Sequence, residues 1–118
     1  MLKVYVAGKL NDSAVGYIKN MHVMITTANE IQRYGFSVFV PCLDILSGLV
    51  DGHFNYMDYF ENNVPWMESA DCVFVCRNYE TSEGTKKEIA HAIERKIPVI
   101  YNIVELIAFK EMIERGIS

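Results

Sequence analysis

The sequence has few basic residues, no cysteine framework and no apolar run of membrane-spanning length, and each absence excludes a class of protein. Its 11 Lys and Arg residues against 15 Asp and Glu residues give a net charge of -4. That balance argues against nucleic-acid polymer as a partner, because such surfaces usually carry a basic stripe. A membrane-spanning helix needs about 20 consecutive apolar residues, so we expect no membrane partner. The first expected strand begins almost at Met1, which leaves no room for a signal peptide.

The three cysteines suit neither a disulfide nor a metal site. Cys72 and Cys76 lie four residues apart on one expected strand, about 13 Å at roughly 3.3 Å per residue, which is too far for a disulfide. Cys42 stands alone after another strand, and no metal-ligand spacing links the cysteines to the three histidines. Buried, reduced, structural thiols suit a cytosolic protein. We therefore expect a cytoplasmic protein without a metal.

The chain has the composition of one globular domain with a substantial core. It contains 118 residues, of which 51% are hydrophobic and 22% charged, as in soluble globular proteins. We expect a single domain over residues 1–118, with apolar, β-rich runs alternating with helical patterns. The expected strands are Leu2–Ala7, Phe36–Val40, Asp71–Arg77 and Ile97–Tyr101. The expected helices are Asp12–Tyr34, Phe54–Ser69, a third that opens at Gly84 and Thr85, and Val104–Arg115.

This alternation predicts a parallel sheet with right-handed crossovers and helices on both faces. The expected fold is a flavodoxin-like, Rossmann-like three-layer α/β sandwich. Its sheet has four strands, or five, in the order 2-1-3-4. That order places the ends of the first and third strands side by side, where open α/β sheets bind ligands.

The first helix is expected to start from Asp12 or Ser13 as N-cap and to stop at Gly35. Its apolar residues recur at three- and four-residue spacing and predict one buried face: Ile18, Met21, Ile25, Ala28 and Ile31.

The stretch Cys42–His53 and the aromatic helix after it are harder to interpret. The stretch is long and rich in turn signals, which fits either an active-site lid or a plain surface loop. We expect the helix Phe54–Ser69 to be interrupted near Pro65. Its aromatic residues are more typical of core or subunit contacts than of a base-stacking platform, and they favour a homo-oligomer: Tyr56, Tyr59, Phe60 and Trp66.

Polar side chains converge at the ends of the first and third strands. With the order 2-1-3-4, the loop after Gly8 faces the loop before Glu88. We expect Glu88 in the first turn of its helix, where the helix dipole favours an ionised carboxylate, as a nucleophile or general base requires. Tyr5 is expected to donate a hydrogen bond to Glu88. Ser82 and the amides around Gly84 form an expected anion or hydroxyl site.

Each candidate also has a purely structural interpretation. The segment Thr85–Glu88 matches a capping box, in which Thr85 caps the helix and Glu88 reaches back to it. Ser82 is equally suited to a loop or cap position. His91, one turn beyond Glu88, fits a partly exposed helix histidine better than a proton shuttle.

Two further charged residues fit either of two roles. Arg77, at the end of the third expected strand, suits an anionic substrate or a surface ion pair. Asp44 lies near the expected ligand edge of the sheet or caps a turn.

Several of these residues together resemble a known family. Tyr5-Val6-Ala7-Gly8 is similar to the Y-x-A-G signature of nucleoside 2-deoxyribosyltransferases, and Ala70-Asp71 resembles their second marker. Ser82-x-Gly84-x-x-x-Glu88, followed by Ala92, is similar to their nucleophile motif. The resemblance implies that Glu88 attacks C1′ of a deoxyribose, displaces the base, and passes the sugar to another base or to water.

The same resemblance implies roles for other residues and no cofactor. Tyr5 would orient Glu88, and Gly8 would belong to the base-binding loop. Ser82 stands where the transferases usually carry an aspartate, whereas the related 2′-deoxynucleoside 5′-phosphate N-hydrolases have a phosphate-reading serine. Lys9, Arg77 or Lys86 would then meet an anionic substrate.

Asn63, with Asn62, occupies the region of a family aspartate, and a neighbouring subunit completes the active sites of the family. A transferase, a 5′-phosphate hydrolase and a non-catalytic nucleotide-binding protein of the same fold therefore remain as hypotheses. An FMN-binding flavodoxin is disfavoured, because Lys9–Ser13 lacks the hydroxyl-rich run expected around an FMN phosphate.

Overall fold

The structure is a computed structural model that describes residues 1–10, 13–41 and 56–116. Within them, a four-stranded, all-parallel sheet in the order β2-β1-β3-β4 forms the middle layer. Its strands are β1 (Lys3–Ala7), β2 (Ser37–Phe39), β3 (Cys72–Val75) and β4 (Val99–Ile100). The predicted fold class and strand order are confirmed.

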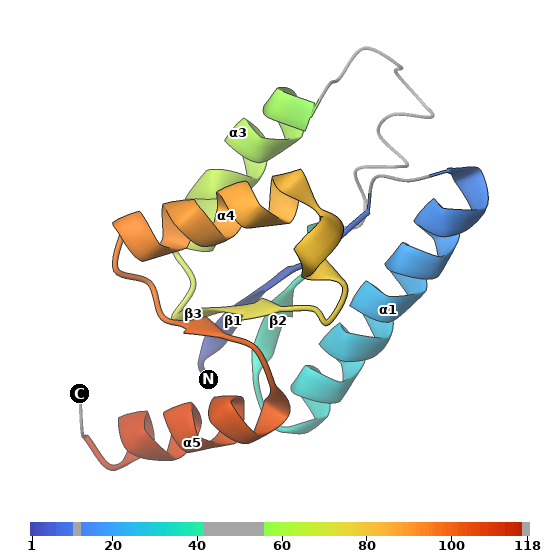
Figure 1. The fold of residues 1–118 in the computed structure, drawn as a ribbon. Coiled ribbons are helices and arrows are strands. Elements are labelled where there is room, and N and C mark those ends of the chain that lie inside the picture. The colour runs from blue at the N-terminus through green and yellow to red at the C-terminus, as the bar shows by residue number, and fades with distance from the viewer. Residues whose placement is uncertain (11–12, 42–55, 117–118) are drawn as a thin grey trace.

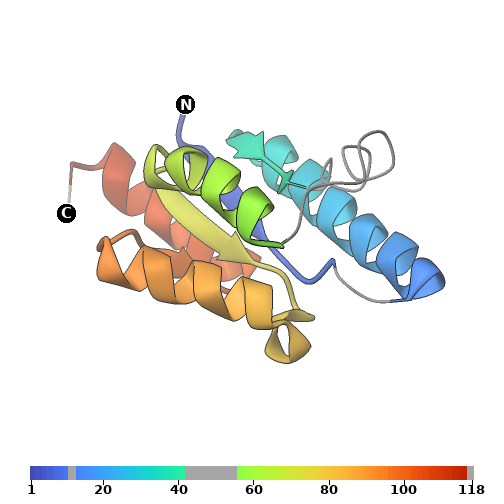
Figure 2. The same cartoon turned by 90° about the horizontal axis from the view of Figure 1, so that it is seen from above.

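Helices cover both faces of the sheet, as the sequence predicted (Figure 1). The helices α1 (Ala14–Arg33) and α5 (Ile103–Glu114) pack on one face. The helices α3 (Tyr56–Glu68) and α4 (Glu83–Glu94) pack on the other, and Figure 2 shows them side by side. A short 3₁₀ helix, η2 (Tyr79–Thr81), leads from β3 toward α4. No helix within the described ranges combines the length and apolar character needed to cross a bilayer.

Each face of the sheet has its own core, and the strands contribute to both by alternation. The α1/α5 core includes Val4, Val6, Cys72, Phe74 and Cys76 from the sheet with Met24, Ala28, Ile31 and Leu106 from the helices. The α3/α4 core includes Tyr5, Ala7, Val73 and Val75 from the sheet with Met67, Ile89 and Ala92 from the helices.

The ends of α1 agree with the prediction, and its buried face agrees in part: Ala28 and Ile31 are buried and Met21 packs against the core, as predicted. Ser13 caps the helix, and Gly35, at a φ of +91°, follows its end. Ile18 and Ile25, predicted to be buried, are 60% and 39% exposed. The buried stripe centres on Met24, and at about 100° per residue both isoleucines lie roughly 100–120° around the helix from it.

The helix α3 continues through Pro65, so the predicted interruption there is wrong. Pro65 has no amide proton and therefore cannot donate the usual hydrogen bond to the preceding turn. The missing hydrogen bond lies near the end of α3, and the residues after Pro65 are held in place by other contacts. Met67 is fully buried in the α3/α4 core, and the Ser69 amide donates to the Pro65 carbonyl at 3.2 Å.

The strands are shorter than the apolar runs that predicted them. Only Val99–Ile100 of the run Ile97–Tyr101 pairs as β4, next to β3. Pro98 has no amide to donate to a ladder, and its carbonyl accepts from Val73 at 2.9 Å. The strand β4 therefore begins after the proline, and Pro98 contributes only its carbonyl to the pairing with β3.

Candidate active site

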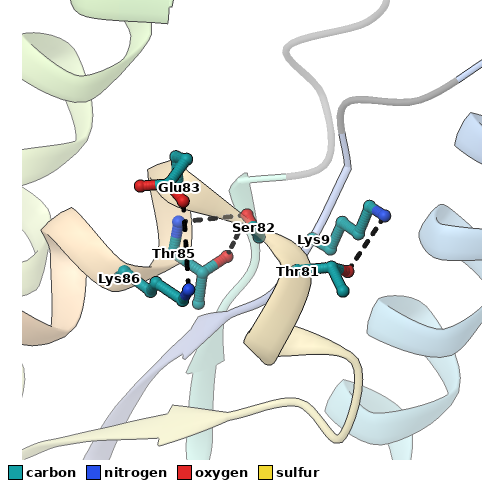
Figure 3. A network of polar contacts seen from close by, with 6 residues as sticks. All are labelled: Lys9, Thr81, Ser82, Glu83, Thr85 and Lys86. Carbon is teal, nitrogen blue, oxygen red and sulfur yellow. Dashed lines mark hydrogen bonds and ion pairs between the residues drawn. The ribbon is translucent and has the colours of Figure 1, made fainter.

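The third predicted helix begins earlier than expected, because Ser82 caps it. The Ser82 Oγ accepts from the Thr85 amide at 3.1 Å and from the Thr85 hydroxyl at 2.9 Å (Figure 3). The Thr85 side chain is buried, with 1% exposed. The interpretation of Ser82 as a cap residue is confirmed, and α4 starts at Glu83.

This start rules out the capping box that the segment Thr85–Glu88 suggested. Thr85 lies inside the first turn, and Glu88, predicted in that turn, lies in the second. The prediction placed the start at Gly84 and Thr85, one to two residues later than the structure has it. A serine followed directly by Glu83 was the stronger signal, since serine is a good cap and an acidic residue stabilises a first turn.

Glu88 instead points to the sheet, where Tyr5 holds it. The Tyr5 hydroxyl donates to Glu88 Oε2 at 2.6 Å, joining β1 to α4 across 83 positions of the chain. Tyr5 is completely buried and Glu88 is half-buried. Such a short distance is typical of a hydroxyl that donates to a charged carboxylate. The predicted contact is therefore present, while the role of Glu88 as a nucleophile stays a prediction.

The loop after β1 and the segment before α4 face each other, as predicted. The Lys9 Nζ donates to the Thr81 Oγ1 at 3.0 Å (Figure 3). Lys86, a second candidate for an anionic substrate, lies 3.9 Å from Glu83, with half of its side chain exposed. Exposed pairs of this kind contribute little stability.

A second polar link joins the same two loops to α1. The Asn78 side-chain Nδ2 donates to the Asn20 Oδ1 at 3.1 Å, and the Asn20 side-chain Nδ2 donates to the Leu10 carbonyl at 3.4 Å. Two sets of hydrogen bonds therefore connect the loops that follow β1 and β3: one through Lys9 and one through Asn20 of α1.

Gly8 is required for space rather than for a special backbone angle. A Cβ there would lie 3.0 Å from the Cys76 Sγ and 3.1 Å from the Met24 Cε, and its φ is not in the left-handed region. The family resemblance implied that Gly8 belongs to a base-binding loop, and that role stays a prediction. The structure adds a tight contact between the ends of β1 and β3.

The other candidate residues lie in different surroundings. Arg77 is exposed in the turn after β3, two residues beyond Val75, and Gly84 is in the first turn of α4. Asn63 is a buried polar residue of α3 and accepts from the Asn62 amide at 3.3 Å. Asp44, like the whole stretch Cys42–His53, lies outside the described residues.

A family model described as a domain of unknown function, DUF4406, matches residues 2–101. That range holds the four strands of the described residues together with α1, α3 and α4. The chain belongs to the DUF4406 family. No curated protein and no solved structure matches it.

In this DUF4406 chain, His91 of α4 contacts a carboxylate at the end of α3. The His91 Nε2 lies 2.9 Å from the Glu68 Oε1, and the Arg95 Nε lies 3.8 Å from the same oxygen. This arrangement joins α3 to α4 and agrees with the structural interpretation of His91.

The cysteines of the DUF4406 domain that the structure describes are structural, as predicted. Cys72 and Cys76 are buried and free. Burial, followed by the Asp71 charge, raises the pKa of Cys72 to about 12. Burial also raises the pKa of Cys76 to about 11. Both thiols are therefore neutral at physiological pH, and no metal-binding cluster occurs among the described residues.

The sequence did not predict that Phe39 stacks on Tyr5, or that Trp66 stacks on Phe39. The Tyr5 ring stacks on Phe39, with centroids 5.5 Å apart and planes at 18°. Phe39 in turn stacks on Trp66, at 5.4 Å and 7°. The signal that could have found Phe39 is its place on the strand beside Tyr5, at a position that faces the same core.

Proposed function

We propose that this DUF4406 chain cleaves the N-glycosidic bond of 2′-deoxynucleosides or their 5′-phosphates, with Glu88 as the nucleophile. The observation that carries the proposal is the 2.6 Å hydrogen bond from the Tyr5 hydroxyl to Glu88. A carboxylate held by a buried phenol has a restricted rotamer, so it reaches a reacting atom without reordering. The resemblance to nucleoside 2-deoxyribosyltransferases assigns these two residues to the reacting centre.

The proposed chemistry follows the logic of a retaining glycosidase. A Glu88 oxygen forms a bond to C1′ while the bond from C1′ to the base nitrogen breaks. The base leaves with that electron pair and takes up a proton. Water or an acceptor base then attacks C1′ of the ester, gives up a proton, and releases the carboxylate.

The polar contacts of Ser82 favour a substrate with a 5′-phosphate. A serine hydroxyl has two acceptor lone pairs and one proton. The Ser82 oxygen accepts twice from Thr85, whose buried hydroxyl uses it as acceptor. The Ser82 hydroxyl can therefore still donate one hydrogen bond to a ligand, and a phosphate oxygen is a suitable acceptor.

Positive charge lies close to this serine. Lys9 contacts Thr81, the residue directly before Ser82. Hydrolysis of deoxynucleoside 5′-phosphates is therefore the first activity to test, ahead of transfer between bases. A non-catalytic nucleotide-binding protein would use the same phosphate contacts without Glu88 chemistry.

The test is release of free base, followed by chromatography. Each deoxynucleoside and its 5′-phosphate is incubated with the protein, with and without an acceptor base. Release in water from the phosphates indicates a hydrolase, and exchange only with an acceptor indicates a transferase. Absence of both rejects the enzymatic proposal. Binding of a nucleotide in calorimetry would then support the non-catalytic alternative.

Glu88→Gln should lower kcat by at least about 10³-fold, because it removes the nucleophile. Glu94→Gln is the matched control, since Glu94 is an exposed carboxylate of the same helix. We expect it to keep wild-type turnover. Mass spectrometry of the quenched reaction should show a deoxyribosyl group on Glu88 in the wild type. Equal activity of Glu88→Gln and wild type would remove Glu88 from the mechanism.

A further inference from the structure

Three aromatic rings from three separate elements form one continuous stack that ends at the candidate nucleophile. Trp66 of α3 stacks on Phe39 of β2, and Phe39 stacks on Tyr5 of β1. The hydroxyl of Tyr5 then reaches Glu88 of α4. The stack therefore leads from an exposed ring, since Trp66 is 55% exposed, to a completely buried one.

Strand pairing sets the contact between the first two rings. Tyr5 and Phe39 are direct partners in the parallel register of β1 and β2. Their side chains leave the sheet on the same face, where both pack in the α3/α4 core. Aromatic pairs on neighbouring strands interact in this way across a sheet.

Phe39 is held from both sides. The plane of Trp66 lies within 7° of the Phe39 plane, and that of Tyr5 within 18°. A phenyl ring between two near-parallel rings cannot turn about its own axis without displacing one of them. The plane of Tyr5 is thus set by a partner that is itself clamped.

We propose that Phe39, supported by Trp66, is a positioning residue for Glu88. By fixing the plane of the Tyr5 ring, Phe39 places the Tyr5 hydroxyl at 2.6 Å from the Glu88 carboxylate and so holds its rotamer. The effect on turnover rests on the function proposed above, whereas the effect on the hydrogen bond does not.

A side chain of similar volume without a flat face would fill the space but leave the Tyr5 ring free to tilt. Misplacement of a reacting group by about 1 Å costs on the order of 10²-fold in rate. Phe39 carries no polar group of its own. We therefore expect its loss to lower kcat rather than to raise KM.

The experiment compares Phe39→Leu with Phe39→Tyr, which retains the ring, and with Val38→Ala. Val38 lies on the same strand but packs against the α1/α5 core, so it controls for loss of stability. Trp66→Leu is a second, milder variant, because Trp66 is largely exposed. Thermal unfolding confirms that each variant is folded.

The first measurement is independent of catalysis. A buried phenol proton donated to a carboxylate exchanges slowly, and its proton NMR signal is assigned by its loss in Tyr5→Phe. We expect the signal in wild type, Phe39→Tyr and Val38→Ala, and its loss or broadening in Phe39→Leu. Absence from the wild type, or full retention in Phe39→Leu, overturns the inference.

The second measurement is the kinetics of base release. In Phe39→Leu, kcat should fall about 10- to 100-fold with KM within threefold, and the acid limb of the kcat profile should move to higher pH, because the lost hydrogen bond favoured the ionised carboxylate. An equal fall of kcat in Val38→Ala overturns the inference. Wild type without turnover, but with the expected NMR signals, rejects the proposed function and leaves the positioning contact supported.

Discussion

The two faces of the same sheet differ in what they bury. The α1/α5 core consists of apolar side chains and two thiols, and burial keeps those thiols protonated. The α3/α4 side buries hydroxyl and amide groups, from Tyr5 of the sheet, Asn63 of α3 and Thr85 of α4. Alternate residues of β1, such as Val4 and Tyr5, serve the two sides.

Under the proposed function, this difference assigns stability to one face of the sheet and catalysis to the other. Buried polar groups are costly unless they are hydrogen-bonded. The Tyr5 and Thr85 hydroxyls meet that requirement through Glu88 and Ser82. A change on the α1/α5 side should therefore alter the free energy of unfolding and leave turnover intact. A change on the α3/α4 side should alter turnover as well.

The largest test of this division lies in the middle of the α1/α5 core. Ile31→Ala should lower the free energy of unfolding by about 2–5 kcal/mol, because Ile31 is completely buried. The kcat of the folded fraction should stay within twofold of wild type. Urea denaturation and the base-release assay measure the two effects. Ile25→Ala, at a partly exposed site of α1, is the control. A loss of kcat comparable to that of Glu88→Gln would contradict the division.

Alkaline pH provides the second test, through the buried thiols. The unfolded Cys72 thiol ionises near its ordinary value of 9.0, whereas burial and Asp71 raise the folded pKa to about 12. Above pH 9.0 only the unfolded state loses the proton, so stability falls with rising pH until the folded thiol ionises as well. The slope approaches about 1.4 kcal/mol per pH unit for each thiol.

Urea denaturation between pH 8 and pH 11, in steps of about half a unit, measures this slope. Cys72→Ala should make this slope less steep, whereas Glu94→Gln, at an exposed carboxylate of α4, should not change it. Parallel pH profiles for wild type and Cys72→Ala would show that the thiol is not responsible.

A smaller effect tests the point where the ends of β1 and β3 touch. Gly8→Ala should cost about 1–3 kcal/mol, because its Cβ would lie 3.0 Å from the Cys76 Sγ. In a double-mutant cycle, Cys76→Ala should recover part of this cost by removing the sulfur. Strictly additive costs would mean that this contact is not the cause.

The smallest expected effect separates the two roles of Ser82. Ser82→Ala should cost about 1 kcal/mol, the usual value of a lost N-cap. Ser82→Asp retains a capping side chain but adds a negative charge. It should keep the stability and raise KM for deoxynucleoside 5′-phosphates more than for deoxynucleosides. An equal change of KM for both substrates would count against a phosphate at Ser82.

The features that could be predicted from the sequence are those with a strong local or topological signal. Alternation of strands and helices was enough for the strand order, and that order was enough to expect Tyr5 beside Glu88. The contact is present at 2.6 Å. Ser13 and Gly35 were recognised because caps and stops depend on local backbone chemistry.

The errors arose where tertiary packing chooses between local alternatives. Met24 and Ile25 both lie three or four residues from Met21 and from Ala28, so both fit the spacing of a buried face. Only packing against the sheet selects Met24, which is buried, over Ile25, which is 39% exposed. Ser82 and Thr85 are both acceptable caps, and the structure uses Ser82. Phe39 gave no signal because its importance depends on the register of β1 with β2 and on the place of Trp66.

The cap of α4 has a consequence for how far relatives of this chain can diverge. Five residues separate Ser82, which starts the helix, from Glu88, which meets the sheet. Inserting or deleting one residue between them would rotate Glu88 by about 100° around the helix axis, away from Tyr5. A substitution in this interval keeps the direction of Glu88, whereas an insertion or a deletion does not. A relative that retains the tyrosine and the glutamate but has a different interval needs a different start for the helix.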